Sequence, residues 1–476
     1  MRLELRQIAH WCGAEFEGAG GDGVAAVGYS IDSRTIAPGE LFFAVKGERF
    51  DGHDFIGAAV AGGAIAAVVS REKLAEARVE VGSHPLLIVP DTLKALQQLA
   101  AAVRRDWARE GGRQGGRRVI GITGTAGKTT TKEAVAKVLS ARFSVLKSQG
   151  NLNNGYGLPL QLLKLEPTHE VAVIEMGMSN AGEIAALAYI AAPDWGVVTN
   201  VGTAHAQNFP DGIAGIARAK YELVEALPQH GVAFLNCDDA YVGQFGRNFR
   251  GKAVYFGRGP CADPRAQAIA PQGAEGQTVD VRAGEQHATL RLRLLGEHNV
   301  LNALAGIAVG IEAGIPLETC CEALAELAPA DKRGQILSIG GATVINDCYN
   351  CNPEALKAMI GTLAAMPVGA GGRRILVAGA MLELGPESAA LHAMGGRAAA
   401  AARIDLIVGV SGDARVLTDA AREAGVETMF FETPEDAGSW LRETVRAGDV
   451  VLLKASRGVR LELALETWRT PEDRRA

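Results

Sequence analysis

Apolar runs alternate with amphipathic segments through the middle of the chain. The runs are "RRVIGIT" (117–123), "VAVIEMG" (171–177), "WGVVTN" (195–200) and "GVAFLN" (231–236). Uninterrupted runs of this kind are typical of strands that are buried on both faces of a parallel sheet. The segment 128–143, "KTTTKEAVAKVLSARF", follows the first run and is predicted to be a helix. The pattern therefore predicts a parallel sheet with helical crossovers.

The same alternation continues on both sides of this segment. Three short strands are predicted near the N-terminus, in 39–47, 64–70 and 85–90. The C-terminal part repeats strand–helix units, with strands predicted in 342–347, 374–380, 405–410, 428–433 and 449–455, and with helices at 353–366, around His392, at 413–425, at 434–445 and at 458–468. Asn352-Pro353 and Thr433-Pro434 each look like an N-cap followed by proline at the first helical position. Such a repeat predicts a doubly wound α/β domain.

Two breaks in the pattern divide the 476 residues. The Gly/Arg-rich stretch 109–118 is predicted to be a linker, and 326–335 is a weaker break. A chain of this length is too long for one compact core. We therefore expect an α/β protein of three domains: an N-terminal α/β domain at 1–110, a central P-loop ATPase-like domain with a parallel sheet at 111–328, and a C-terminal Rossmann-like doubly wound domain at 329–476.

Composition and charge disfavour several classes of function and location. The net charge of −6 disfavours nucleic-acid binding, because no overall field attracts a polyanion. The N-terminal stretch lacks the apolar core of a signal peptide, and the apolar segment 55–70 is short for a membrane span. Seven scattered cysteines fit a reducing compartment, and the redox interpretation of the Cys348/Cys351 C-x-x-C is disfavoured. We expect a cytoplasmic protein.

The stretch "GITGTAGKTT" (121–130) predicts a phosphate-binding loop whose first glycine is displaced. The usual G-x-x-x-x-G-K pattern would place that glycine at Ile122, but it stands at Gly121. Loop glycines let backbone N–H groups approach an anion, and the following helix N-terminus favours phosphate. The predicted ATP contacts in this stretch are Gly124, Thr125, Gly127, Lys128, Thr129 and Thr130, with the Thr129 hydroxyl on Mg²⁺. The alternative is a glycine-rich turn with an incidental lysine.

Three residues further along are candidates for a site beside this loop. Glu175 ends an apolar strand, where its carboxylate would meet the metal of the loop. His205 follows another strand, although a single histidine is more often structural. Lys220, taken by itself, looks like an ordinary solvated helix lysine.

Ten blocks of the sequence occur in the order known from one family of enzymes. In chain order they are "SIDSRTIAPGELFFAVKGERFDGHDF", "GITGTAGKTTTKE", "GNLNNGYGLPLQLL", "VIEMGMSNAGEI", "TNVGTAHAQNF", "ARAKYE", "GEHNVLNALAG", "NDCYNCNPEAL", "GAMLELG" and "LLKASRGVRLE". They resemble the Mur ligase superfamily of amide ligases, which carry the displaced loop as T-G-T-x-G-K-T-T. The GNxNN and YNxNP blocks look most like the MurF branch.

The resemblance implies a reaction and its substrates. A MurF-type enzyme is an ATP-dependent, ADP-forming ligase that joins D-alanyl-D-alanine to UDP-N-acetylmuramoyl-tripeptide through an acyl phosphate, in cytoplasmic peptidoglycan precursor synthesis. ATP and Mg²⁺ are the implied cofactors, and we expect a monomer. Whether the third residue of the peptide is lysine or a diamino acid stays open.

The resemblance also assigns roles, residue by residue. Lys128 and Thr129 would hold the ATP phosphates and a first Mg²⁺, and Glu175 and His205 would serve a second. Lys220 resembles the lysine that CO₂ carbamylates in related ligases, which would place a carboxylate beside the metals. The remaining assignments are Asn299 and Asn302 at the adenine, Arg333 and Asp347 at the phosphates and ribose, Ser30, Asp32, Ser33 and Arg34 at the uridine diphosphate, and Tyr349, Asn350 and Asn352 near the acceptor peptide.

Three positions depart from the family pattern. Ala380 stands where Asp is usual, so a polar role is lost or moved, for instance to Glu383. Cys351 stands where Ala is usual, and Asn346 where Asp is frequent.

Other functions are kept open. The nearest are a MurE-like ligase and a folylpolyglutamate synthase, which the YNCNP and SIDSR blocks respectively disfavour. A P-loop ATPase switch or motor, and a nucleotide-binding scaffold without catalysis, belong to other classes.

Overall fold

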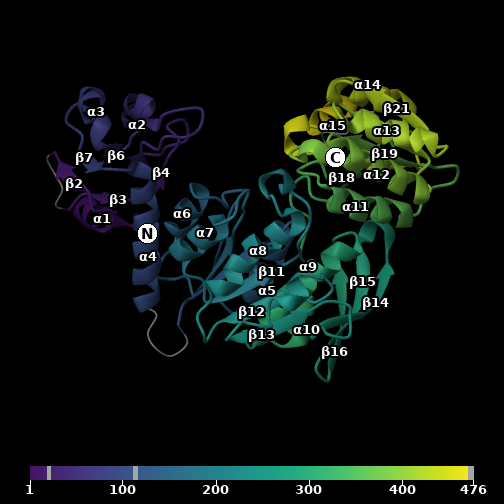
Figure 1. Cartoon of the computed structure of the whole chain (residues 1–476), viewed down its shortest axis with the longest axis horizontal. Helices are drawn as coiled ribbons and strands as arrows, with labels where there is room; N and C mark the ends of the chain where they lie inside the picture. The colour runs from purple at the N-terminus through teal and green to yellow at the C-terminus, as the bar shows by residue number, and fades with distance from the viewer. Residues whose placement is uncertain (19–22, 111–115, 470–476) are drawn as a thin grey trace.

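The computed structural model describes residues 1–18, 23–110 and 116–469. Three α/β units follow one another along the chain (Figure 1), and the first and last lie at opposite ends of the long axis with the middle unit between them. The predicted linker lies partly outside the described residues, at 111–115. The weaker break at 326–335 connects the last helix of the middle unit to the first strand of the C-terminal unit without regular structure until Gln335. The exact boundaries at 110/111 and 328/329 remain predictions.

The N-terminal unit is built on a five-stranded sheet in the order β2-β7-β6-β5-β4. Strands β4 to β7 are parallel, and β2 pairs with β7 in the antiparallel sense. Its elements are β1 Leu3–Glu4, α1 Leu5–Cys12, β2 Glu15–Glu17, β3 Ala25–Ala26, β4 Gly28–Ser30, β5 Glu40–Phe43, α2 Ile56–Ala61, β6 Ala66–Ser70, α3 Leu74–Val81, β7 Leu86–Val89 and α4 Thr92–Glu110.

Helix α4 packs against both the N-terminal and the middle unit. Arg104 donates from Nε to the carbonyl of Ala191 at 2.9 Å, and from Nη2 to Asp194 Oδ2 at 2.9 Å. Trp107 is fully buried, and its Nε1 donates to the carbonyl of His169 at 3.1 Å. Side chains of α4 therefore join the first unit to the middle unit in one continuous apolar cluster.

The middle unit has a six-stranded, wholly parallel sheet in the order β13-β12-β11-β8-β10-β9, as the apolar runs predict. Its elements are β8 Arg118–Thr123, α5 Lys128–Leu139, β9 Val145–Lys147, α6 Gly157–Leu162, β10 Val171–Glu175, α7 Glu183–Ala191, β11 Trp195–Val198, α8 Gly212–Glu225, β12 Val232–Asn236, β13 Lys252–Phe256, β14 Arg265–Pro271, β15 Gln277–Ala283, β16 Gln286–Leu292, α9 Glu297–Glu312 and α10 Leu317–Ala325. Helix α5 ends at Leu139, four residues before the predicted end at 143.

A second sheet in this unit was not predicted. Strands β14, β15 and β16 form a three-stranded antiparallel sheet on which α10 packs. These strands alternate buried and exposed residues and carry many polar side chains, so they lack the continuous apolar runs of the central sheet.

The C-terminal unit has a six-stranded sheet in the order β17-β18-β22-β19-β20-β21. All pairs are parallel except β17 with β18. Its elements are β17 Gln335–Ile339, β18 Ala342–Asn346, α11 Pro353–Ala365, β19 Arg374–Gly379, α12 Ser388–Ala401, β20 Leu406–Val410, α13 Ala414–Glu423, β21 Glu427–Phe431, α14 Pro434–Thr444, β22 Val450–Lys454 and α15 Glu462–Trp468.

Two local predictions about these helices are confirmed and one is wrong. The side chains of Asn352 and Thr433 cap α11 and α14, each with proline next in the chain. The last helix begins at Glu462 and not at 458, because Arg460 has a left-handed φ of 57° that a continuous helix cannot include.

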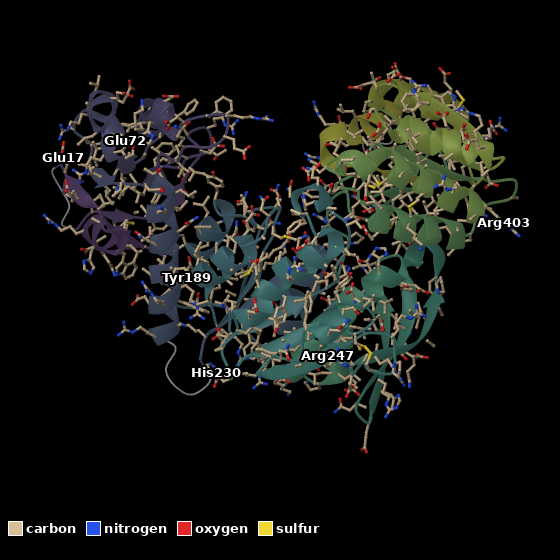
Figure 2. All side chains as sticks on the ribbon, viewed as in Figure 1. Glu17, Glu72, Tyr189, His230, Arg247 and Arg403 are labelled. Atoms are coloured by element: carbon tan, nitrogen blue, oxygen red, sulfur yellow. A yellow bond between two sulfur atoms is a disulfide. The ribbon has the colours of Figure 1, made fainter. Side chains whose placement is uncertain are left out.

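The cysteines and the surface complete the picture. Cys348 and Cys351 are free and buried, whereas Cys237 and Cys261 form a disulfide, a pairing that the expectation of reduced thiols did not include. Exposed large apolar side chains are spread over the units, with Tyr189 of α7 on the middle unit (Figure 2). No helix in the described part of the chain is long and apolar enough to cross a membrane.

Candidate active site

One cavity of about 650 Å³ lies where two sheets meet. The carboxyl ends of β8, β10, β11 and β12 supply one wall from the middle unit, and those of β18, β19 and β22 supply the other from the C-terminal unit. Ligands of open α/β sheets bind at these ends of the strands. The cavity therefore brings two such binding edges face to face.

The loop between β8 and α5 forms the floor on the middle side. Gly124 and Gly127 have φ values of 151° and 80°, and a Cβ there would collide with Thr199 and Asn302 respectively. Lys128 is half-buried, and its Nζ donates to the carbonyls of Gly124 at 2.7 Å and Thr125 at 3.2 Å. Burial lowers the pKa of Lys128, with Glu175 opposing. The loop is thus curled around its own lysine, and Thr125 to Thr130 all line the cavity.

Thr129 and Glu175 come together as the sequence suggested. The Thr129 hydroxyl donates to Glu175 Oε2 at 3.0 Å, and Asn153 Nδ2 donates to Glu175 Oε1 at 2.9 Å. Glu175 is only 3% exposed and ends β10, the strand next to β8. A hydroxyl and a carboxylate at this distance are oxygen donors that suit Mg²⁺.

His205 lies across the boundary between the two units. Its Nδ1 is 3.0 Å from Glu383 Oε2, and Glu383 follows β19 in the C-terminal unit. Burial lowers the pKa of His205, against the opposing pull of Glu383. Close by, Glu354 Oε1 accepts hydrogen bonds from the Thr203 amide and hydroxyl, both at 2.9 Å. These contacts join the loop after β11 to the C-terminal unit.

Lys220 lies on α8 and is not among the residues that line the cavity. It is 3% exposed, and no hydrogen-bond or ion-pair partner of its amine is found in the described ranges. Burial, reinforced by the charge of Lys128, holds the pKa of Lys220 well below its ordinary value. A buried amine in this state is not the solvated helix lysine that the sequence alone suggested.

Asn299 and Asn302 line the cavity from α9. Asn302 Oδ1 accepts from the Thr131 hydroxyl at 3.0 Å, and its Nδ2 donates to Asn299 Oδ1 at 3.0 Å. Asn302 therefore braces the start of α5 from the side, and its predicted contact with adenine stays a prediction.

The C-terminal wall carries Arg333, Asp347 and the loop that contains Tyr349, Asn350 and Asn352. The Arg333 guanidinium stacks on the Tyr349 ring, 4.0 Å from its centroid. Asp347 contacts Lys454, a residue to which the sequence analysis gave no role. All five predicted residues of this unit thus share the cavity with the phosphate loop.

The predicted uridine diphosphate residues do not line this cavity. Asp32 accepts from the amide, Nε and Nη2 of Arg34 at 3.0, 2.9 and 2.6 Å, and its own amide donates to Ser30 Oγ. The Arg34 guanidinium lowers the pKa of Asp32 to about 2. The Arg34 side chain is 85% exposed even in this pair, so a ligand on the N-terminal unit can reach it, and Ser33 beside it is half-buried.

The three positions that depart from the family pattern lie in or near this site. Ala380 is buried at the end of β19, so it offers no polar group, while Glu383 reaches His205. Cys351 is buried in the loop before α11, and Asn346 accepts a hydrogen bond from Cys348 at 2.9 Å.

Three polar residues of the site were missed by sequence reasoning. Asn153, Glu354 and Lys454 lie inside quoted sequence blocks, but only their contacts with Glu175, Thr203 and Asp347 single them out.

The donor set for a metal is sparse. No group of three or more His, Cys, Asp and Glu side chains that could hold a metal ion occurs within 1–18, 23–110 and 116–469. Thr129 at a first ion, and Glu175 with His205 at a second, would leave most coordination positions to other ligands, which suits Mg²⁺, since it keeps waters and binds substrate phosphates.

Comparison with known proteins matches each unit to one family. Residues 26–104 match "Mur ligase family, catalytic domain", residues 122–310 match "Mur ligase middle domain", and residues 332–457 match "Mur ligase, glutamate ligase domain". The UDP-N-acetylmuramoyl-tripeptide–D-alanyl-D-alanine ligase of Bacillus subtilis (strain 168) is 34% identical over 438 residues, which is 91% of each chain. Its counterpart in Escherichia coli (strain K12) is 35% identical over 424 residues, 88% of each chain.

Solved structures agree. MurF from Acinetobacter baumannii superposes with a TM-score of 0.87 at 29% identity, covering 98% of this chain and 99% of that one. MurF ligase from Thermotoga maritima in complex with ADP gives a TM-score of 0.80 at 29% identity, with 94% and 98% covered. The chain belongs to the Mur ligase family, within its MurF group.

Proposed function

We propose that this chain uses ATP to join D-alanyl-D-alanine to UDP-N-acetylmuramoyl-tripeptide through an acyl phosphate. The reaction class rests on one observation: the phosphate loop at 124–130 and the loop at 349–352 line the same cavity. The choice of substrates rests on the relatives, which are named UDP-N-acetylmuramoyl-tripeptide–D-alanyl-D-alanine ligases and match this chain over about nine tenths of their length.

ATP is held from both walls in this proposal. The backbone N–H groups of the loop and Lys128 bind the phosphates, while Asn299 and Asn302 meet the adenine. Arg333 and Asp347 reach the phosphates and ribose from the C-terminal unit. A first Mg²⁺, held by Thr129, and a second, held by Glu175 and His205, would neutralise charge on the phosphate oxygens. A MurF ligase with ADP bound is among the similar structures, which supports the nucleotide site.

The chemistry proceeds in two transfers. The terminal carboxylate of the tripeptide attacks the γ-phosphorus of ATP, which forms an acyl phosphate and releases ADP. The amine of D-alanyl-D-alanine then attacks the acyl carbon, and the tetrahedral intermediate expels inorganic phosphate as the amide forms. Lys128 and Arg333 would stabilise the negative charge that both steps concentrate in the cavity.

Lys220 contributes through modification. Burial lowers the pKa of this amine, which favours the neutral form that can attack CO₂, and the resulting carbamate, formed with loss of a proton, would place an anion near the site. Such an anion would support metal binding together with Glu175.

The units must move together for this reaction. The uridine end of the donor would bind at Ser30, Asp32, Ser33 and Arg34 on the N-terminal unit, while the reacting carboxylate lies in the cavity between the other two. Closure would bring these parts together and keep water from the acyl phosphate.

The rival functions are disfavoured by specific observations. A diaminopimelate-adding ligase is similar only at 18% identity and a TM-score of 0.52, which reflects the shared fold. A P-loop switch would leave the N-terminal unit and the 349–352 loop without a role.

Phosphate release from ATP and Mg²⁺ tests the proposal. Each substrate should be omitted in turn, with both the lysine and the diaminopimelate form of the tripeptide supplied. Release that needs tripeptide and D-alanyl-D-alanine together, with a UDP-pentapeptide product by mass, is expected. Release without either substrate would favour a switch, and product formed only when a free diamino acid is offered to a dipeptide precursor would favour a MurE-like ligase.

A further inference from the structure

Lys454 and Asp347 are neighbours because of the strand order in the C-terminal sheet. Strand β22 lies beside β18 with Leu453 opposite Asn346, and the Asp347 amide donates to the carbonyl of Leu453 at 2.9 Å. The two side chains therefore emerge together at the carboxyl ends of adjacent parallel strands. Both line the cavity.

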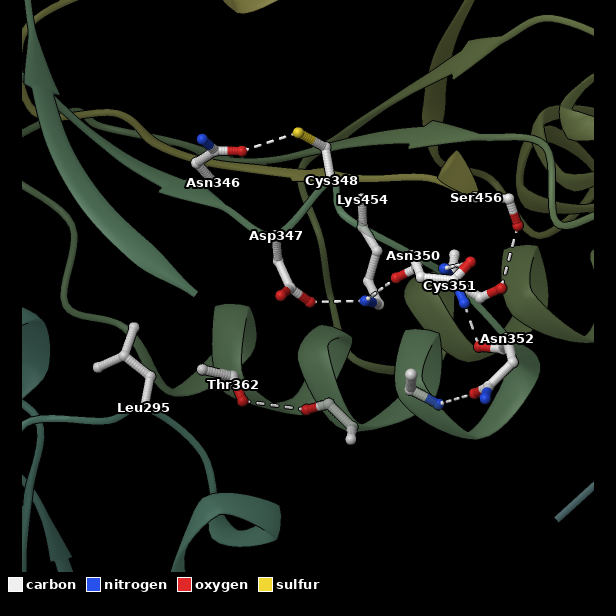
Figure 3. A network of polar contacts seen from close by, with 12 residues as sticks. Leu295, Asn346, Asp347, Cys348, Asn350, Cys351, Asn352, Thr362, Lys454 and Ser456 are labelled. Carbon is white, nitrogen blue, oxygen red and sulfur yellow. Dashed lines mark hydrogen bonds and ion pairs between the residues drawn. The ribbon is translucent and has the colours of Figure 1, made fainter. Parts of the chain in front are cut away.

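The Lys454 ammonium group joins two parts of the site (Figure 3). Its Nζ is 2.5 Å from Asp347 Oδ2 and donates to the carbonyl of Asn350 at 3.0 Å. The side chain is 3% exposed, against 15% for Asp347. Burial favours the neutral amine, but Asp347 outweighs it, so the pKa of Lys454 lies above its ordinary value. One buried cation thus fixes a carboxylate and a loop carbonyl at the same time.

A second residue of the same segment holds the next carbonyl. The Ser456 hydroxyl donates to the carbonyl of Cys351 at 3.1 Å and accepts from the Leu382 amide at 3.0 Å. The following residue, Asn352, is held by its own cap on Ala355 at 2.8 Å. The loop at 349–352 is therefore fixed from one side by the chain that leaves β22, as Figure 3 shows.

We propose that Lys454 is a positioning residue that sets Asp347 for the nucleotide and the 349–352 loop for the acceptor through one ammonium group. The inference rests on the proposed function, since it takes Asp347 as a nucleotide contact and the loop as an acceptor contact. It gives a role to the "LLKASRG" block, which the reaction did not otherwise need. Ser456 acts on the acceptor side alone.

Replacement of Lys454 by methionine separates this role from simple structural support. Lys454→Met keeps the length of the side chain and removes the charge, so Asp347 loses its partner and the Asn350 carbonyl loses its donor. We expect the KM values for ATP and for D-alanyl-D-alanine each to rise about tenfold, which corresponds to about 1.4 kcal/mol per ligand. The KM for the UDP-tripeptide should stay within about twofold, since its uridine end binds on another unit.

Three companion variants keep the test decisive. Ser456→Ala should raise the KM for D-alanyl-D-alanine and leave that for ATP unchanged, whereas Asp347→Asn should affect ATP more than the acceptor. Lys454→Arg keeps the charge and the N–H donors, so its KM values for ATP and for D-alanyl-D-alanine should lie between those of the wild type and those of Lys454→Met. Melting temperature and ADP affinity should be measured for every variant, so that loss of folded enzyme is recognised.

The outcomes separate cleanly. The inference would be overturned if Lys454→Met kept the wild-type KM values for ATP, D-alanyl-D-alanine and the UDP-tripeptide while only kcat or the melting temperature fell. Lys454 would then have a structural role. An effect on ATP alone, with the acceptor KM unchanged, would also overturn it. Failure of the wild-type enzyme to make UDP-pentapeptide would instead refute the proposed function.

Discussion

Glu383 of the C-terminal unit holds its carboxylate 3.0 Å from Nδ1 of His205 in the middle unit. With Nδ1 engaged, Nε2 of the imidazole is the nitrogen left to face a metal. Histidines that bind metals commonly donate their other ring N–H to a carboxylate, which fixes the ring and raises its basicity. Ala380, three residues before Glu383, offers no carboxylate of its own.

Glu383→Gln should therefore weaken Mg²⁺ use. We expect the Mg²⁺ concentration for half-maximal activity to rise by about tenfold or more. The melting temperature should change little, because both side chains are partly exposed and such pairs contribute about 1 kcal/mol or less. Glu387→Gln, an exposed residue in the same region, is the matched control. An unchanged Mg²⁺ dependence would mean that Glu383 only joins the two units.

Lys128→Ala should abolish phosphate release while the fold persists. The amine that now closes the loop at 2.7 Å from the Gly124 carbonyl would no longer meet the phosphates, and kcat should fall by about 100-fold or more. Lys137→Ala removes a half-exposed lysine from the same helix and should leave the rate unchanged. Near-normal turnover by the Lys128 variant would refute the loop assignment.

Lys220 should bind CO₂ and Lys132 should not. The two lysines are buried to the same degree, at 3% and 2% exposed, but Lys132 has the Glu133 carboxylate 3.1 Å from its Nζ, whereas no such partner of Lys220 is found among the described residues. With ¹³C-labelled bicarbonate, one carbamate signal is expected by NMR, lost in Lys220→Ala and kept in Lys132→Met. Bicarbonate should also restore activity to CO₂-depleted enzyme. Absence of both responses would leave Lys220 as an unmodified buried lysine.

Arg34→Ala should raise the KM for the UDP substrate far more than the KM for ATP. The guanidinium is exposed and lies on the N-terminal unit, away from the ATP cavity. Arg78→Ala, which breaks the comparable exposed pair with Glu17 on the same unit, should change neither KM. Equal rises in both KM values after Arg34→Ala would assign it a structural role.

The Arg34 pair also predicts a flat pH response. Arg34 depresses the pKa of Asp32, so the contribution of this pair is present above the ordinary aspartate pKa and is lost only as pH falls toward about 2. The KM for the UDP substrate should show no change near pH 4 from this pair. A change there that Asp32→Asn removes would contradict the assignment.

Much of the fold could be predicted from local pattern. The strands of the central sheet are apolar on both faces, and the turn after β8 needs Gly124 and Gly127, so both features are visible in a short window of sequence. The sheet of β14 to β16 could not be predicted in this way, because its exposed face interrupts the apolar pattern. Nor could the double role of α4, because the pattern shows that a helix has an apolar face but not which core the face meets.

The residues of the site also differ in whether local sequence could predict them. Glu175 could be found because it ends a strand next to the phosphate loop, and parallel strands bring such ends together. The partners of His205 and Asp347 are 178 and 107 residues away in sequence and depend on domain contact and strand order. The resemblance supplied the residues of the site, and the structure supplied the pairs among them.

The central claim is that the tripeptide carboxylate is phosphorylated in this cavity before the amine attacks. Transfer of ¹⁸O tests it most directly: UDP-N-acetylmuramoyl-tripeptide labelled at its terminal carboxylate is turned over with ATP, Mg²⁺ and D-alanyl-D-alanine, and the released phosphate is analysed by mass. An acyl phosphate predicts that each phosphate carries one labelled oxygen from the carboxylate. Phosphate free of label, with UDP-pentapeptide formed or not, would show that ATP hydrolysis proceeds without activating the peptide and would contradict this account.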